Sequence, residues 1–201
     1  MLRDRSPTRA DLAARRVDDL SLMSRLRADD VAALDELMSL YWRPLVVYVY
    51  EIVGTVDAAE DVVQDVFVRV WARRSEWRPS GSVRSFLYRI ARNLALNERR
   101  AVRVRELWSE RERAERAGAS VTPLRLVEDR EIAERVRRAV AALPARQREI
   151  LTLARFHGLS HQQIAEVLGI SPHTVANHIR AAFAALREAL RPLLDVDPAA
   201  E

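Results

Sequence analysis

Two blocks in the first half of the chain decide its fold: Asp57-Ala-Ala-Glu-Asp-Val-Val-Gln-Asp-Val-Phe-Val-Arg-Val-Trp71 and Ser85-Phe-Leu-Tyr-Arg-Ile-Ala-Arg-Asn-Leu-Ala-Leu-Asn-Glu-Arg-Arg100. In both blocks apolar residues recur at spacings of three and four, which is typical of an amphipathic helix. The stripe expected to be buried in the first helix consists of Val62, Val63, Val66, Phe67, Val70 and Trp71. The stripe expected in the second consists of Val83, Phe86, Leu87, Ile90, Ala91 and Leu94. The sequence therefore predicts two neighbouring helices joined by a loop from Ser75 to Ser82.

The two helices lie in regions of opposite charge. From Asp29 to Asp65 there are nine carboxylates against one arginine, a net charge of −8, and from Arg84 to Arg105 there are seven arginines against one glutamate, a net charge of +6. This local positive excess is larger than the +4 of the whole chain. Charged helix faces are often only the solvated surface of a bundle. Separation this complete instead favours two different partners, one basic and one anionic.

The second helix is expected to turn its polar and basic side chains outward: Arg84, Tyr88, Arg89, Arg92, Asn93 and Asn97. The loop before it contains Trp77, which in an ordinary interhelical loop would cap the core. Aromatic side chains also stack on the unpaired bases of a nucleic-acid strand. On the residues alone, both interpretations of Trp77 stay open.

The composition of the chain indicates a helical protein of one or two domains. Of its 201 residues 49% are apolar, 31% are charged and five are glycine. There is no cysteine, which excludes disulfides and cysteine-ligated zinc. No stretch approaches the roughly 20 apolar residues of a membrane span, and the first residues lack the apolar core of a secretory signal. We therefore expect an all-α protein in the cytoplasm, with no membrane insertion.

Residues that typically begin and end helices predict a helix-turn-helix in the second half of the chain. Ser160 and Gln163 form a capping box, Gly169 is a helix stop, and Ser171 caps a further helix that starts with Pro172. In such a unit the second helix enters the major groove of DNA, and its first residues reach the base edges. The candidate residues for this contact are Ser171, His173, Thr174, Asn177, His178 and Arg180. A helical hairpin that does not bind DNA is the alternative.

No catalytic or metal site is expected. The four histidines are residues 157, 161, 173 and 178. A glycine interrupts the first pair, and the second pair is spaced by five residues, which places it on different helix faces. The chain has no glycine-rich phosphate loop, and its carboxylates gather where a docking face is expected. We therefore predict a protein that is not an enzyme and needs no cofactor.

Both blocks of the first half resemble region 2 of the extracytoplasmic-function (ECF) sigma factors of bacterial RNA polymerase. The second half, with Leu143-Pro-Ala-Arg-Gln-Arg-Glu149 and Ser171-Pro-His-Thr-Val-Ala-Asn-His-Ile-Arg-Ala181, resembles their region 4. The resemblance covers roughly Asp29 to Leu190. One departure is Phe86, where the family often has tryptophan. The resemblance implies an initiation subunit that binds core polymerase and reads two promoter elements.

The resemblance also implies a role for each surface. The first helix would dock on the clamp helices of the largest polymerase subunit through Asp57, Glu60, Asp61, Gln64 and Asp65. The second helix and its preceding loop would hold the melted −10 strand through Trp77, Arg78, Arg84, Tyr88, Arg89, Arg92, Asn93 and Asn97. The helix-turn-helix would read the −35 duplex. Because the chain must present all these surfaces at once, an anti-sigma factor that covers them is an expected regulator.

The domain organisation expected from these segments has five parts. Residues 1–18 form a tail, 19–100 region 2, 101–127 a linker into which the basic helix continues, 128–190 region 4, and 191–201 a second tail. Two helices in region 4 are expected to meet at Leu143-Pro144.

Within region 2, a short helix from Asp18 to Arg27 should cover the core. A longer helix should begin at Asp29 or Asp30 and end at Gly54. Its inner face should contain Val31, Leu34, Leu37, Met38 and Tyr41. Pro44 should kink or divide it.

Two other classes of protein are compatible with parts of the sequence. An activator of the LuxR type has a similar helix-turn-helix, but it would need a receiver or ligand domain with strands, and the first 120 residues show no convincing strand. A helical adaptor that uses only its acidic face would not need the helix-turn-helix.

Overall fold

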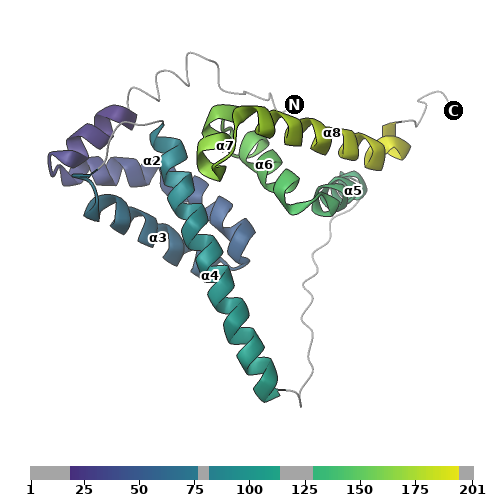
Figure 1. Cartoon of the computed structure of the whole chain (residues 1–201), viewed down its shortest axis with the longest axis horizontal. Helices are drawn as coiled ribbons and strands as arrows, with labels where there is room; N and C mark the ends of the chain where they lie inside the picture. The colour runs from purple at the N-terminus through teal and green to yellow at the C-terminus, as the bar shows by residue number, and fades with distance from the viewer. Residues whose placement is uncertain (1–18, 77–81, 114–128, 195–201) are drawn as a thin grey trace. The chain divides into compact units, whose positions relative to one another are not determined.

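The computed structural model describes residues 19–76, 82–113 and 129–194, and all regular secondary structure in these ranges is helical (Figure 1). The all-α prediction is confirmed. The chain divides into two compact units, the first containing the described residues up to Arg111 and the second those from Glu112 onward, except Glu166–Leu168. In the described ranges, no helix is long and apolar enough to cross a bilayer.

The described part of the first unit begins with a helix over residues 19–27. It is followed by α2 (Val31–Val53), α3 (Val56–Ala72) and α4 (Val83–Arg113). The helices expected in this half of the chain are therefore present. The basic helix continues beyond the predicted domain boundary at Arg100, as the linker sequence had suggested.

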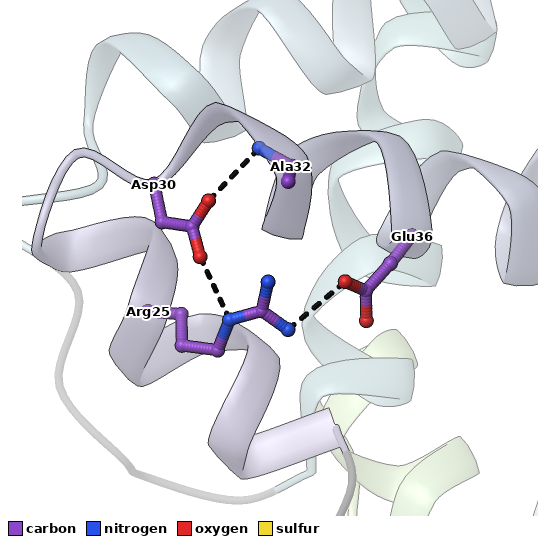
Figure 2. Close-up of polar contacts among 4 residues, drawn as sticks. All are labelled: Arg25, Asp30, Ala32 and Glu36. Carbon is purple, nitrogen blue, oxygen red and sulfur yellow. Dashed lines mark hydrogen bonds and ion pairs between the residues drawn. The ribbon is translucent and has the colours of Figure 1, made fainter.

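Asp30 fixes the start of α2. Its carboxylate accepts a hydrogen bond from the backbone N–H of Ala32 at 3.0 Å, which satisfies one of the unpaired donors of the first turn. Arg25 of the preceding helix donates to Asp30 at 2.8 Å and to Glu36 at 3.0 Å (Figure 2). The hydrogen bond from Arg25 lowers the pKa of Asp30. Since these side chains are 36–53% exposed, the cluster sets the geometry of the turn more than it adds stability.

Two outcomes were predicted at Pro44, a kink or a division of the helix. Because α2 continues through Pro44, the division is wrong. Proline lacks the N–H that would bond to the carbonyl of Leu40. Because Leu40 is 53% exposed, water can reach that side of the helix. The helix ends as expected at Gly54, whose φ of 88° is readily adopted only by glycine.

The core of the first unit takes apolar side chains from each of its described helices. Fully buried members are Met23, Leu26, Leu37, Leu45, Val49, Val63, Val66, Leu87 and Ala91. Trp42 of α2 stacks on Phe67 of α3 with ring centroids 6.1 Å apart, and Tyr48 of α2 meets Tyr88 of α4 at 5.2 Å. Each large apolar side chain buried in this way contributes about 1.5–3 kcal/mol.

The predicted apolar stripes are largely confirmed in this core. The α3 stripe is buried except for Trp71, which is half-buried. On α2, Leu37 and Tyr41 are buried, and Leu34 and Met38 are half-buried. Val31 is 58% exposed, so its placement on the inner face is wrong. It is the first residue of the helix, where few neighbours surround it.

A buried hydrogen bond connects the first described helix to α2. The Tyr41 hydroxyl donates to the carboxylate of Asp19 at 2.5 Å, and both residues are less than 10% exposed. Burial, followed by the charge of Asp19, raises the pKa of Tyr41. The short helix over residues 19–27 therefore covers the core through Leu22, Met23 and Leu26, and the hydrogen bond of Asp19 joins it to α2.

The second unit contains α5 (Asp129–Ala142), α6 (Ala145–Arg155), α7 (His161–Leu168) and α8 (Pro172–Leu194). Leu143 and Pro144 separate α5 from α6 as predicted, and Ile150, Leu151 and Leu153 face inward. Leu143 packs with Leu151 and with Ala182 of α8. Helix α8 runs four residues past the predicted end of region 4 at Leu190.

The helix caps and the helix end predicted around α7 are confirmed. The Ser160 hydroxyl accepts from the backbone N–H of Gln163, and the Gln163 side chain accepts from the N–H of Ser160. Gly169 ends α7 with a φ of 66°. The Ser171 hydroxyl then accepts from the N–H of Thr174 at 3.0 Å at the start of α8. Two short sequences therefore fix the turn between the helices.

Candidate protein and nucleic-acid interfaces

The acidic residues of α3 lie together on its exposed face. The five residues predicted there, all exposed, are Asp57, Glu60, Asp61, Gln64 and Asp65. The opposite face is held in the core by the valines and Phe67, which fixes the direction of the carboxylates. We call these five residues the acidic face. Its start coincides with the first turn of α3, where the helix dipole favours negative charge.

Sequence reasoning missed an apolar member of this surface. Val68 is 57% exposed and follows Gln64 by four residues and Asp61 by seven, so the three residues lie along one line of α3. The sequence could have revealed this, because Val68 does not belong to the apolar stripe that was predicted to be buried. The combination of carboxylates with an exposed valine suits a protein partner that is basic and partly apolar.

Arg74 holds the end of α3 in place. Its side chain pairs with Asp29 at 2.5 Å and donates to the carbonyl oxygen of Trp71 at 2.9 Å. The guanidinium carbon also lies 4.1 Å from the centre of the Trp71 ring, a cation–π contact. These contacts join the turn before α2 to the last turn of α3. The helix that carries the acidic face is therefore held in two ways. Its buried apolar residues pack in the core, and the contacts of Arg74 hold its C-terminal end.

The outward face of α4 carries several of the predicted nucleic-acid residues. Arg89, Asn93 and Asn97 are exposed and Arg92 is half-buried. The guanidinium carbon of Arg89 lies 5.9 Å from the centre of the Phe86 ring. Cationic and amide side chains in this arrangement can bind phosphates and base edges.

Two residues predicted on this outward face lie elsewhere. Tyr88 is completely buried against Tyr48, so its predicted outward orientation is wrong. Arg84 is half-buried, with its guanidinium carbon 6.0 Å from the centre of the Tyr88 ring. Burial raises the pKa of Tyr88 to about 12, although nearby Arg84 opposes that rise. Both residues were misplaced because the buried side of α4 is wider than the single apolar stripe that was predicted.

The two remaining residues of this set, Trp77 and Arg78, lie outside the described residues. The described chain stops at Glu76 and resumes at Ser82, whose hydroxyl accepts from the N–H of Ser85 at 3.0 Å. This hydrogen bond caps the start of α4.

The first turns of α8 present the predicted duplex-reading residues. His173, Asn177 and Arg180 are exposed, while Thr174 and His178 are half-buried. Arg180 donates to the amide oxygen of Asn177 at 2.5 Å, which places a guanidinium beside the carboxamide.

Exposed Ser171 is also the cap of α8, and its hydroxyl lies 2.8 Å from that of Thr174. Buried Val175 anchors the opposite side of the helix.

Histidines are not gathered in this unit. His157 is buried with 6% exposure, whereas His161 and His173 are exposed. Among the described residues, no group of three or more histidine, aspartate or glutamate side chains is arranged to hold a metal ion.

Comparison with protein families identifies both units. Residues 37–105 match the Sigma-70 region 2 family, and residues 133–186 match the Sigma-70 region 4 family. The chain resembles two solved structures: CnrH in complex with the cytosolic domain of CnrY, and RpoE of Bartonella quintana in complex with the anti-sigma factor NepR. The TM-scores are 0.61 and 0.57, at 24% and 23% identity. The matches cover 90% and 78% of this chain, and 99% and 96% of those chains.

Curated relatives extend the similarity over most of the sequence. The chain is 31% identical over 184 residues to the RNA polymerase sigma-H factor of Pseudomonas aeruginosa, covering 88% of this chain and 95% of that protein. It is 32% identical over 170 residues to the ECF RNA polymerase sigma factor SigL of Mycobacterium tuberculosis, covering 81% of this chain and 89% of that protein. The chain therefore belongs to the ECF family of RNA polymerase sigma factors.

Proposed function

We propose that this ECF sigma factor divides its work among the three surfaces described above. The acidic face of α3 binds the clamp helices of the largest core polymerase subunit. The outward face of α4 holds the melted −10 strand, and the first turns of α8 read the −35 duplex. The chain carries out no catalytic step and acts in the cytoplasm, where it meets polymerase and promoter DNA. The observation that carries this proposal is the segregation of acidic and basic residues onto separate, core-anchored helices.

The acidic face suits a protein partner better than a nucleic acid. Its carboxylates would repel phosphates, whereas complementary charge on a protein speeds association and excludes wrong partners. Exposed Val68 beside them offers apolar surface of the kind that stabilises a protein interface.

The α4 and α8 surfaces suit nucleic acid for different reasons. On α4, arginines and asparagines project from one rigid helix along the path of a strand. On α8, Asn177 can pair bidentately with adenine, and Thr174 can contact a thymine methyl group. Arg180 can bind the adjacent phosphate. The exposure of Asn177 near the start of the helix supports this assignment.

Regulation by an anti-sigma factor follows from the same division. A protein that covers the acidic face and the DNA surfaces would block every step at once. The resemblance to RpoE of Bartonella quintana, which was captured with the anti-sigma factor NepR, supports this part of the proposal. Affinity purification from the native cell should recover an inhibitor that suppresses transcription by the reconstituted holoenzyme. Recovery of the chain with polymerase alone would count against it.

Run-off transcription tests the proposal directly. Bacterial core polymerase is incubated with and without the chain on a library of upstream DNA from the native genome. Initiation at specific sites should depend on the chain, and the aligned start regions should share −35 and −10 elements. If the chain alone binds duplex DNA tightly and supports no initiation, the activator interpretation would replace this one.

A further inference from the structure

One hydrogen bond determines which way the carboxamide of Asn177 faces. Arg180, three residues further along α8, donates from Nη2 to the amide oxygen of Asn177 at 2.5 Å. A guanidinium carries N–H donors and no acceptor, so the amide atom beside it must be the oxygen. The amide nitrogen therefore points away from Arg180. Its two N–H groups donate no hydrogen bond to the described parts of the chain, so they are available to a ligand.

Within the described ranges, no carboxylate competes for Arg180. Its side chain is exposed, and no aspartate or glutamate of these ranges forms an ion pair with it. The amide oxygen of Asn177 is therefore the acceptor that the guanidinium finds on its own helix. The hydrogen bond also restricts both side-chain torsions of Asn177, because a change in either one would separate the oxygen from Arg180.

The backbone beneath this pair is held by the core of the second unit. Val175 and Ala182 of α8 are completely buried, and Ala182 belongs to the core cluster of that unit. Asn177 lies two residues after Val175, about 200° around the helix, which places it on the opposite side. Packing therefore fixes the point at which Asn177 leaves the helix, and Arg180 fixes the orientation of its amide.

The order of donor and acceptor on a carboxamide decides which purine it recognises. Adenine presents the N7 acceptor beside the N6 amino donor, whereas guanine presents two acceptors, N7 and O6. A carboxamide pairs with adenine when its oxygen accepts from N6 and its nitrogen donates to N7. The oxygen has two lone pairs, so it can accept from adenine and from Arg180 together. If the amide turned over, its nitrogen would face the N6 donor of adenine and would instead suit the O6 acceptor of guanine.

We infer that Arg180 is a positioning residue for base recognition, which holds the amide of Asn177 in the orientation that reads adenine and disfavours guanine. The inference rests on the proposed function, in which the first turns of α8 read the −35 duplex. Arginine keeps further N–H groups after this hydrogen bond, so Arg180 can also contact a phosphate. The two roles have different effects. A phosphate contact supports every sequence equally, whereas control of the amide changes the preference at one base pair.

The test uses holoenzyme assembled from the full chain and core polymerase, and promoter duplexes in which each −35 base pair is replaced in turn. Asn177→Ala identifies the base pair that Asn177 reads, because the wild-type preference for adenine is lost there. Arg180→Ala should lower the ratio of adenine to guanine affinity at this base pair about threefold to tenfold, the cost of ordering one side chain. The double variant should discriminate to the same extent as Asn177→Ala alone, because Arg180 acts through Asn177.

Arg187→Ala is the matched control. Arg187 is exposed on the same helix, seven residues after Arg180, and within the described ranges it donates to no base-reading residue. Its removal should weaken binding to all the duplexes equally, at most, and should leave the adenine-to-guanine ratio unchanged. If Arg180→Ala likewise loses affinity equally for every duplex, the inference is overturned and Arg180 has the phosphate role alone.

The Asn177→Ala measurement separates failure of the inference from failure of the proposed function. If this variant alters no base-pair preference, the reading assigned to the first turns of α8 fails, and the inference fails with it. If it removes a preference for guanine instead of adenine, the assignment of Asn177 to base reading stands and the inferred orientation of its amide is wrong.

Discussion

The hydrogen bond between Tyr41 and Asp19 can be tested by removing one oxygen atom. Tyr41→Phe leaves the ring in the core but removes one hydrogen bond to a buried carboxylate. Hydrogen bonds to charged groups contribute about 1.5–3 kcal/mol, so the free energy of unfolding should fall by about that amount. Urea denaturation followed by circular dichroism measures it.

Tyr50 provides the matched control, because its ring is 46% exposed on the same helix. Tyr50→Phe should change the unfolding midpoint little. If both variants unfold at the same urea concentration, the hydrogen bond from Tyr41 to Asp19 does not stabilise the fold.

Tyr88 predicts how stability changes at alkaline pH. Its folded-state pKa is about 12, above the ordinary value of 10, so the folded state retains a proton that the unfolded state loses. This contribution is fully present below pH 10 and is lost as the pH rises toward 12, by an amount on the order of 2 to 3 kcal/mol. The chain has neither lysine nor cysteine to titrate in this range.

The measurement is the free energy of unfolding at several pH values between 9 and 12, compared between wild type and Tyr88→Phe. The wild type should lose stability more steeply. Parallel curves would show that Tyr88 titrates normally and is not enclosed as described.

The error on Tyr88 shows what residue patterns leave undetermined. Arg84, Tyr88 and Ala95 are spaced by four, three and four residues together with Ala91 of the predicted stripe, so they widen that stripe on one side. A tyrosine and an arginine in that stripe were interpreted as surface residues because of their polar ends. Only packing against Tyr48 shows that α4 is enclosed on this side, and a single helix sequence does not contain that contact.

At the scale of the element, the capping box makes α7 testable. Ser160→Ala removes the acceptor for the N–H of Gln163, which should cost about 1 kcal/mol. Amide hydrogen exchange in α7 should become about fivefold faster, because its opening free energy falls by that amount. His161→Ala, at an exposed position beside the cap, should leave exchange unchanged. Equal rates in the two variants would exclude a stabilising role for the box.

The ends of the helices could be predicted from the sequence more reliably than features that depend on tertiary packing. Asp30, Gly54, Ser160 and Gly169 act through neighbours a few residues away, so local sequence was sufficient to locate them. The continuation of α2 through Pro44 could not be located in this way, because a proline inside a helix pattern is compatible with either outcome. The acidic face was correctly oriented because burial of the α3 valines determines which way its carboxylates point.

At the scale of the whole molecule, each unit is expected to contribute a separate step to initiation. Asp61→Arg reverses a charge on the acidic face and should weaken core binding at least about tenfold, because like charges then meet. Binding of the chain to −35 duplex should not change. Asp35→Arg, an exposed position on α2 outside the acidic face, is the control.

Asn177→Ala should have the reverse effect, with normal core binding and a loss of about 1–3 kcal/mol of −35 discrimination. Because the two residues belong to different compact units, their free-energy effects should add in the double variant. Run-off yields at subsaturating chain should therefore fall by the product of the single effects. On a template with a scrambled −35 element, Asn177→Ala should cause no further loss. A further loss on that template would mean that Asn177 acts through folding or core binding instead of through base recognition.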